Sequence, residues 1–142
     1  METRETAVTG GTETILVVED EAAVRELIRL LLADFGYGVI EAGNGEEALA
    51  AARRISGRID LVLADDRLPG MGGRELLRQL RIVHPEAKTL LVSGGNLNLS
   101  ETELQEPGME FLPKPFTAAS LAQTVRRIFD AGPEQALGHA AP

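Results

Sequence analysis

The chain has 142 residues, a formal net charge of −8 at pH 7 and no cysteine, and 44% of its residues are hydrophobic. This size and composition fit one globular domain with a real core, and they exclude a disulfide framework. The acidic balance argues against a nucleic-acid backbone as the main partner, because that binding depends on Lys and Arg displacing counterions. A divalent cation or a basic protein surface fits better.

The two ends of the chain are expected to be tails. Residues 1–13 are rich in Thr, Glu and Gly without periodicity, and residues 132–142 form a Gly, Pro and Ala stretch. We therefore expect a disordered N-terminal tail at 1–13, one domain at 14–131 and a flexible C-terminal tail at 132–142. No apolar stretch approaches the roughly 20 residues that a membrane helix needs. We expect no membrane span and a cytoplasmic location.

Five short apolar runs predict strands. The runs at 15–18, 61–64 and 89–92 are continuously apolar, which is typical of strands buried on both faces of a parallel sheet. Weaker runs at 38–41 and 109–112 predict edge strands.

Amphipathic segments between these runs predict helices. In the first segment, apolar residues at helical spacing stop at Gly36, and glycine is favoured just beyond a helix end. Asn44, three residues before Glu47, is the predicted N-cap of the second helix, and Thr117 is the predicted N-cap of the last.

The remaining segments complete the pattern. A leucine-rich helix ends at Pro85, and a short or partly irregular helix is expected between Ser100 and Pro107. The glycine clusters at 43–45 and 70–73 are expected to be turns. Five strands alternating with five helices predict an α/β fold with a doubly wound, five-stranded parallel sheet. We expect it to be flavodoxin-like, with strand order 2-1-3-4-5.

Polar residues follow the apolar runs where the predicted strands end. Glu19 and Asp20 follow the first run, Asp65 closes the second, and Ser93 and Lys114 follow the last two. The carboxyl ends of parallel strands meet at one edge of a sheet, so we expect these side chains in one pocket. Close carboxylates repel one another unless a cation joins them, and Mg²⁺ prefers oxygen ligands. The set fits magnesium-assisted phosphorylation of an aspartate.

Four motifs stand in the order found in one protein family. They are the segments 15–21, 60–71, 91–94 and 111–116. Together they resemble the receiver domain of two-component response regulators. Segment 106–112 is similar to receivers attached to hybrid sensor histidine kinases.

The resemblance implies a role for each acidic residue of the pocket. Asp65 matches the phosphoacceptor and also contributes to the metal site. Asp20 matches the principal Mg²⁺ ligand, and Glu19 matches a second acidic residue that acts largely through water. The backbone carbonyl of Arg67 would be a further ligand.

The resemblance also implies a switch. Ser93 matches the hydroxyl that hydrogen-bonds the phosphoryl group, and Lys114 matches the lysine that pairs with that group. The peptide bond from Lys114 to Pro115 is expected to be cis. Phe111 stands at the family's aromatic switch position, where it could turn inward behind Ser93, but it lacks a hydroxyl.

Partners follow from the same resemblance. The phosphoryl group would come from a histidine kinase or a histidine phosphotransfer protein. Phosphorylation would shift the surface built by the fourth helix, the fifth strand and the last helix. No direct nucleic-acid or membrane partner is expected. Leu97 and Leu99 would either support a homodimer on the fourth-helix face or belong to the core.

Three residues near these motifs have competing interpretations. Asp66 is a second candidate phosphoacceptor because it is adjacent to Asp65. Neighbouring side chains on a strand point in opposite directions, and the motif spacing favours Asp65. Arg67 either approaches a phosphoryl group or is a solvated cation. His84 stands at a helix end and is expected at the surface.

Two other functions share parts of the pattern. A magnesium phosphatase of the haloacid-dehalogenase type also forms an aspartyl phosphate, but its nucleophile lies near the first strand in an Asp-x-Asp pattern, which this chain lacks. A flavodoxin-like flavin binder shares the architecture, but its first loop binds phosphate through hydroxyls and amides, whereas this first loop is acidic. We therefore expect a phosphoacceptor signalling domain and not an enzyme.

Overall fold

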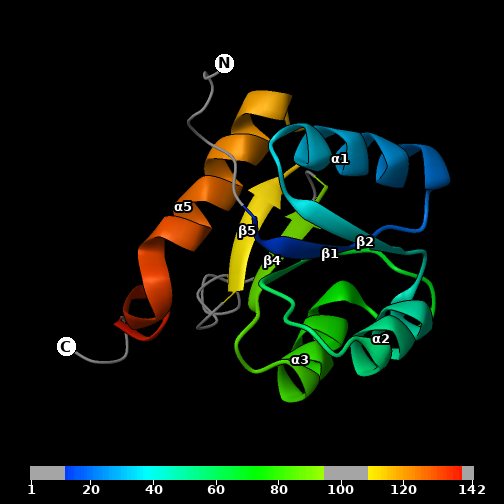
Figure 1. The fold of residues 1–142 in the computed structure, drawn as a ribbon. Helices are drawn as coiled ribbons and strands as arrows, with labels where there is room; N and C mark the ends of the chain where they lie inside the picture. The colour runs from blue at the N-terminus through cyan, green and yellow to red at the C-terminus, as the bar shows by residue number, and fades with distance from the viewer. Residues whose placement is uncertain (1–11, 95–108, 139–142) are drawn as a thin grey trace.

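Five parallel strands form one sheet (Figure 1). The structure, a computed structural model, describes residues 12–94 and 109–138. The strand order is β2-β1-β3-β4-β5 and every neighbouring pair is parallel, which confirms the predicted order and both predicted edge strands. The strands are β1 (Thr14–Val18), β2 (Gly38–Ala42), β3 (Leu61–Asp65), β4 (Lys88–Ser93) and β5 (Met109–Pro113).

Helices cover both faces of this sheet. Figure 1 shows α1 and α5 on one face and α2 and α3 on the other. The expected fourth helix, with Leu97 and Leu99, falls in residues 95–108 and lies outside the described residues. The helices of the described part are α1 (Ala22–Asp34), α2 (Gly45–Arg54), α3 (Gly73–Val83) and α5 (Ala118–Gly138).

Two apolar cores follow the alternation of side chains along the strands. Leu16 of β1 belongs to the core that includes Leu76 of α3. The adjacent Ile15 belongs to the core that includes Ile28 of α1 and Leu121 of α5. Successive side chains of a strand point to opposite faces, so a strand buried on both faces must be apolar throughout. Polar side chains are therefore confined to the ends of the central strands.

The end of α1 is set by Gly36, as predicted. Its φ of 95° lies in the left-handed region, which glycine adopts without a Cβ penalty. The N–H of Gly36 donates to the Ala33 carbonyl at 2.9 Å, and the N–H of Tyr37 donates to the Leu32 carbonyl at 3.2 Å. These two bonds form a Schellman motif, which turns the chain directly into β2.

The last helix is longer than the sequence predicted. α5 continues to Gly138, so the expected start of a flexible tail at residue 132 falls inside the helix. The sequence argument expected a tail there because this Gly, Pro and Ala stretch has too little apolar surface to fold. The residues from Glu134 to Leu137 are good helix formers, which favours this continuation of the helix.

His84 is buried and does not lie at the surface. It is 8% exposed, its Nε2 lies 2.8 Å from the Ala52 carbonyl oxygen of α2, and its Nδ1 lies 3.3 Å from the Glu86 carboxylate. The prediction was wrong because Pro85 indicates where α3 ends but not which helix packs against that end.

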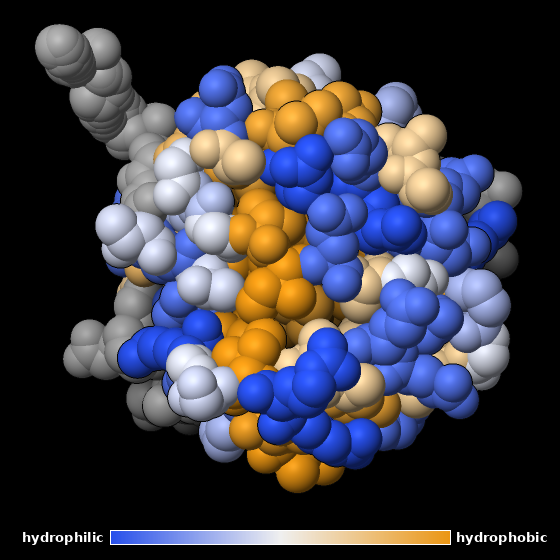
Figure 2. All heavy atoms as spheres, turned by 45° about the vertical axis from the view of Figure 1, so that its right-hand side comes forward, coloured by the Kyte–Doolittle hydropathy of each residue, from blue (hydrophilic) through white to orange (hydrophobic). Residues whose placement is uncertain are grey.

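Some apolar side chains reach the surface. Leu27 and Leu30 of α1 and Ile82 of α3 are at least half exposed, and Figure 2 shows apolar surface as a band between polar areas. Apolar atoms make up much of the surface of any folded protein, so these residues assign no partner by themselves. Within the described ranges, none of the helices has the length and apolar character needed to cross a bilayer.

Candidate functional site

Three carboxylates meet at the carboxyl ends of β1 and β3. Glu19 and Asp20 follow β1, and Asp65 is the last residue of β3. One carboxylate oxygen from each residue lies within 4.8 Å of the other two. β1 and β3 are adjacent in the sheet, so strand pairing brings these distant residues together. Three oxygen ligands at this spacing suit a hard divalent cation such as Mg²⁺.

Glu19 is a buried carboxyl with a raised pKa. Burial raises the pKa of its carboxyl from 4.5 to about 7, and the Asp65 carboxylate adds to the rise, while the Glu21 N–H and the Lys114 ammonium oppose it. The Glu21 N–H donates to Glu19 Oε2 at 3.1 Å. A buried carboxylate beside two others is stabilised in its ionised form by a cation. The electrostatics of the cluster therefore fit a bound metal ion.

Lys114 reaches the cluster from the loop after β5. Its Nζ lies 3.3 Å from Asp65 Oδ2 and 3.9 Å from Glu19 Oε1. The other oxygen of Asp65 accepts a hydrogen bond from the backbone N–H of Arg67 at 3.3 Å. Asp65 is 6% exposed, so the Lys114 ammonium faces a nearly buried carboxylate. The Lys114–Pro115 bond is cis, the isomer that the resemblance implied.

Ser93 lies beside Asp66. Ser93 is 1% exposed, and its Oγ lies 3.4 Å from Asp66 Oδ2 and 3.4 Å from the Gly94 carbonyl oxygen. Its own carbonyl accepts from the Lys114 backbone N–H at 2.7 Å. The two adjacent aspartates thus have different neighbours, since Asp65 faces Lys114 and Asp66 faces Ser93.

Arg67 and Phe111 differ in how far their side chains are buried. The side chain of Arg67 is exposed, and the use of its carbonyl as a metal ligand stays a prediction. Phe111 is partly buried against the core of the α2–α3 face. The Arg74 guanidinium lies over the Phe111 ring, 5.4 Å from its centroid, a distance typical of cation–π contacts. Sequence reasoning missed Arg74, because nothing in the local pattern links α3 to β5.

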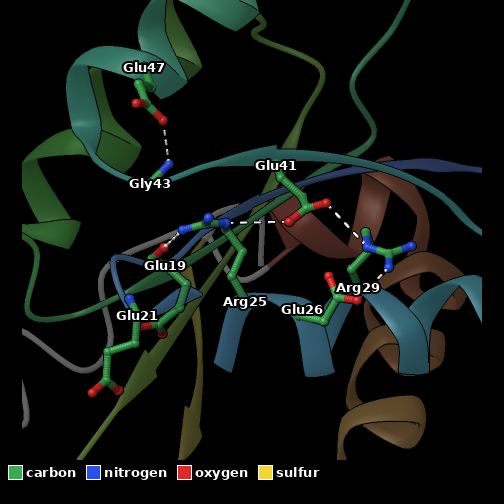
Figure 3. A network of polar contacts seen from close by, with 8 residues as sticks. All are labelled: Glu19, Glu21, Arg25, Glu26, Arg29, Glu41, Gly43 and Glu47. Atoms are coloured by element: carbon green, nitrogen blue, oxygen red, sulfur yellow. Dashed lines mark hydrogen bonds and ion pairs between the residues drawn. The ribbon is translucent and has the colours of Figure 1, made fainter. Parts of the chain in front are cut away.

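Sequence reasoning also missed Arg25, which braces the first acidic loop (Figure 3). Its Nη1 donates to the Glu19 carbonyl at 2.8 Å, and its Nε lies 3.3 Å from Glu41 Oε1 of β2. Glu41 is shared with Arg29, 3.2 Å away. Arg25 therefore ties the loop that carries Glu19 and Asp20 to the neighbouring strand. A lone arginine in a helix gives no sequence signal for such a role.

The glycines expected in turns include two helix starts. Gly45 and Gly73 are the first residues of α2 and α3. A Cβ built on Gly73 would overlap the carbonyl oxygen of Asp65. Gly73 thus allows α3 to begin directly against the end of β3.

Comparison with known proteins assigns the family. The family model described as response regulator receiver domain matches residues 15–126. Sensor kinase CckA of Brucella abortus is 40% identical over 121 residues, which cover 84% of this chain and 13% of that protein. Sporulation initiation phosphotransferase F of Bacillus subtilis is 28% identical over 116 residues, which cover 81% of this chain and 92% of that protein.

Solved structures agree with this assignment. The receiver domain of hybrid histidine kinase CckA has a TM-score of 0.69 and 38% identity, with 81% of this chain and 97% of that chain covered. A response regulator receiver domain protein from Clostridium thermocellum has a TM-score of 0.75 and 28% identity, with 83% and 94% covered. The chain belongs to the response regulator receiver domain family, which confirms the resemblance and its phosphoacceptor function. It spans 13% of CckA and 48% of transcriptional regulatory protein AruR of Pseudomonas aeruginosa.

Proposed function

We propose that this receiver domain accepts a phosphoryl group on Asp65, with Mg²⁺ held by Glu19, Asp20 and Asp65. The proposal is supported by the arrangement around Asp65. The Oδ2 atom of Asp65 lies 3.3 Å from the Lys114 ammonium, and one oxygen from each of the three carboxylates lies within 4.8 Å of the other two. When bound, Mg²⁺ would offset the negative charge of the carboxylates and of the transferring phosphoryl oxygens.

The residues of the chain supply the remaining steps. An Asp65 carboxylate oxygen forms a bond to phosphorus as the bond from phosphorus to the donor breaks, and the donor leaves with its electron pair. Lys114, already paired with Asp65, is placed to pair with the phosphoryl oxygens after transfer. Ser93 offers a buried hydroxyl at the adjacent strand end. Positioning and charge stabilisation are most of what phosphoryl transfer requires of a protein.

The donor is a histidine kinase or a histidine phosphotransfer protein in this proposal. Support comes from the relatives, which include a sensor kinase and a phosphotransferase. The domain would act in the cytoplasm as a signalling element, with Mg²⁺ as its cofactor and without turnover of a separate substrate. Its output would be a changed surface around β5 and α5, with Ser93 and Phe111 as the switch residues.

Labelling with a small phosphodonor tests the proposal. Incubation of the full chain with acetyl phosphate and Mg²⁺ should add the mass of one phosphoryl group, and a chelator should prevent the gain. Asp65→Asn should abolish labelling, while the matched neighbour variant Asp66→Asn should retain it. The same gain in Asp65→Asn, or none in the unaltered chain, contradicts the assignment.

A further inference from the structure

Asp66 is a second carboxylate beside the pocket that the proposed reaction does not use. It stands directly after Asp65, yet it is not a member of the three-carboxylate cluster, which consists of Glu19, Asp20 and Asp65. Its Oδ2 lies 3.4 Å from Ser93 Oγ. The backbone of Asp66 is fixed on both sides, because its N–H donates to the Val92 carbonyl at 2.8 Å and its carbonyl accepts from the Gly73 N–H at 3.2 Å. The main chain that carries the Asp66 carboxylate is therefore fixed by two hydrogen bonds.

The Ser93 hydroxyl has one hydrogen to donate. Its described acceptors are Asp66 Oδ2 and the Gly94 carbonyl oxygen, both at 3.4 Å. An ionised acceptor forms a stronger hydrogen bond than a neutral one, so the carboxylate is the preferred partner. Ser93 is 1% exposed, and water therefore offers its hydroxyl little alternative. A phosphoryl group on Asp65 would add an acceptor that competes for the same hydrogen.

We propose that Asp66 is a positioning residue that holds the Ser93 hydroxyl away from a phosphoryl group on Asp65 and so weakens the hold of the pocket on that group. The inference rests on the proposed function. For Ser93 to donate to a phosphoryl oxygen, its hydrogen bond to Asp66 must break. The negative charge of Asp66 also repels an anionic phosphoryl group. The hydrogen bond to Ser93 and the charge repulsion both weaken binding of the phosphoryl group, and only the hydrogen bond requires Ser93.

Asp66 takes no part in the bond changes themselves. In transfer, the bond from phosphorus to Asp65 forms as the donor bond breaks. In loss, water attacks phosphorus, the bond from Asp65 to phosphorus breaks, and Asp65 regains its carboxylate as inorganic phosphate and a proton leave. Asp66 changes how strongly the phosphoryl group is held between these events.

Trifluoroberyllate, an anion that mimics a phosphoryl group on a carboxylate, gives an equilibrium test. Its affinity for the full chain is measured in Mg²⁺ by NMR titration of backbone amide signals. The chains compared are the unaltered protein, Asp66→Ala, Ser93→Ala and the double variant. Asp66→Asn keeps an acceptor oxygen without the charge. Asp34→Asn is the matched control, since Asp34 is exposed at the last residue of α1. Circular dichroism checks that each variant is folded.

The expected result is coupling between the two positions. Asp66→Ala should tighten trifluoroberyllate binding about fivefold when Ser93 is present, as expected for about one hydrogen bond. In the Ser93→Ala background the same substitution should have a much smaller effect, and Asp34→Asn should have none. Asp66→Asn should fall between the unaltered chain and Asp66→Ala.

Two outcomes would overturn the inference. One is unchanged affinity in Asp66→Ala. The other is equal tightening with and without Ser93, which would leave only charge repulsion. In both cases the unaltered chain still labels with acetyl phosphate and the proposed function stands. Failure of the unaltered chain to label overturns the proposed function itself, so the two failures are distinguishable.

Discussion

Gly73 shows how one residue without a side chain supports the pocket. Its N–H donates to the Asp66 carbonyl at 3.2 Å, and a Cβ at this position would overlap the Asp65 carbonyl oxygen and lie 2.9 Å from Leu91 Cδ1. The first of these neighbours is backbone, which cannot rotate away. Any side chain at residue 73 must therefore displace either the start of α3 or the end of β3.

We expect Gly73→Ala to lower the free energy of unfolding by about 1–3 kcal/mol, the usual cost of forcing atoms into a packed site. Urea denaturation measures the change. Gly57→Ala is the matched control, because a Cβ there meets nothing within 4 Å, and it should leave stability unchanged or slightly higher. Equal losses in the two variants would mean that the contact with Asp65 is unimportant.

The absorbance of Tyr37 can report how its side chain packs against α5. It is the only tyrosine, and the chain has no tryptophan. The centroids of the Tyr37 ring and the Phe129 ring of α5 lie 5.6 Å apart. The Tyr37 hydroxyl accepts a hydrogen bond from Arg126 Nη1 at 3.4 Å. Burial raises the pKa of the Tyr37 phenol above 10.0, and the positive charge of Arg126 opposes that rise.

Alkaline absorbance titration should therefore show Tyr37 ionising at higher pH in the folded chain than in urea. Arg126→Gln should move the folded midpoint further upward, because it removes the opposing charge. The folded state keeps a proton that the unfolded state releases near pH 10, so this group's contribution to stability is lost as pH rises past that value. A folded midpoint at or below the unfolded one would contradict the packing of Tyr37 against α5.

At the scale of elements, α2 begins with paired hydrogen bonds close to the pocket. Asn44 Oδ1 accepts from the Glu47 N–H at 2.8 Å, as the predicted N-cap requires. Glu47 Oε1 accepts from the Gly43 N–H at 2.7 Å, one residue before the position of a regular capping box. The β2–α2 connection is thus fixed by side chains that the sequence pattern identified.

Asn44→Ala should lower the free energy of unfolding by about 1 kcal/mol, because it leaves a helix N–H without its acceptor. Asn44→Asp keeps a capping oxygen and should restore most of the loss. Thermal or urea unfolding of both variants provides the measurement. If Asn44→Asp is as unstable as Asn44→Ala, the side-chain cap does not explain the start of α2.

The elements were predictable because each depends on short-range pattern. Continuous apolar runs identified β1, β3 and β4, and Gly36 and Thr117 marked helix boundaries. Thr117 Oγ1 indeed accepts from the Ser120 N–H at 2.9 Å. The burial of His84 was not predictable, since it depends on how α3 packs on α2. The length of α5 was missed because the Gly, Pro and Ala composition after residue 131 was taken to indicate a tail.

At the scale of the whole molecule, the parallel sheet explains why the pocket residues were predictable as a group. Their placement needs only that β1, β3, β4 and β5 end at one edge, which strand type and order determine. Their individual partners needed coordinates. The pairings of Ser93 with Asp66 and of Arg25 with the Glu19 carbonyl depend on differences of an ångström or less, and hydrophobic patterning carries no information on that scale.

The acidic cluster also couples cation binding to the stability of the entire domain. The chain carries a net charge of −8, and the unfolded state has no preformed cluster, so Mg²⁺ should bind the folded state preferentially. Such a ligand stabilises by about 2.7 kcal/mol when its concentration is a hundred times the dissociation constant. We therefore expect Mg²⁺ to raise the urea midpoint of the domain, and NaCl of equal ionic strength to raise it much less.

Asp20→Asn should remove most of this shift, because it takes one carboxylate from the cluster. Asp34→Asn removes the same charge from an exposed position at the last residue of α1, about 18 Å along the helix from its first residue, and should keep the shift in full. Comparing the variants separates binding at the cluster from general screening, since screening responds to net charge alone. Equal Mg²⁺ shifts in the two variants would show that the ion acts on the whole surface. The acidic cluster would then not be the Mg²⁺ site that the proposed phosphorylation requires.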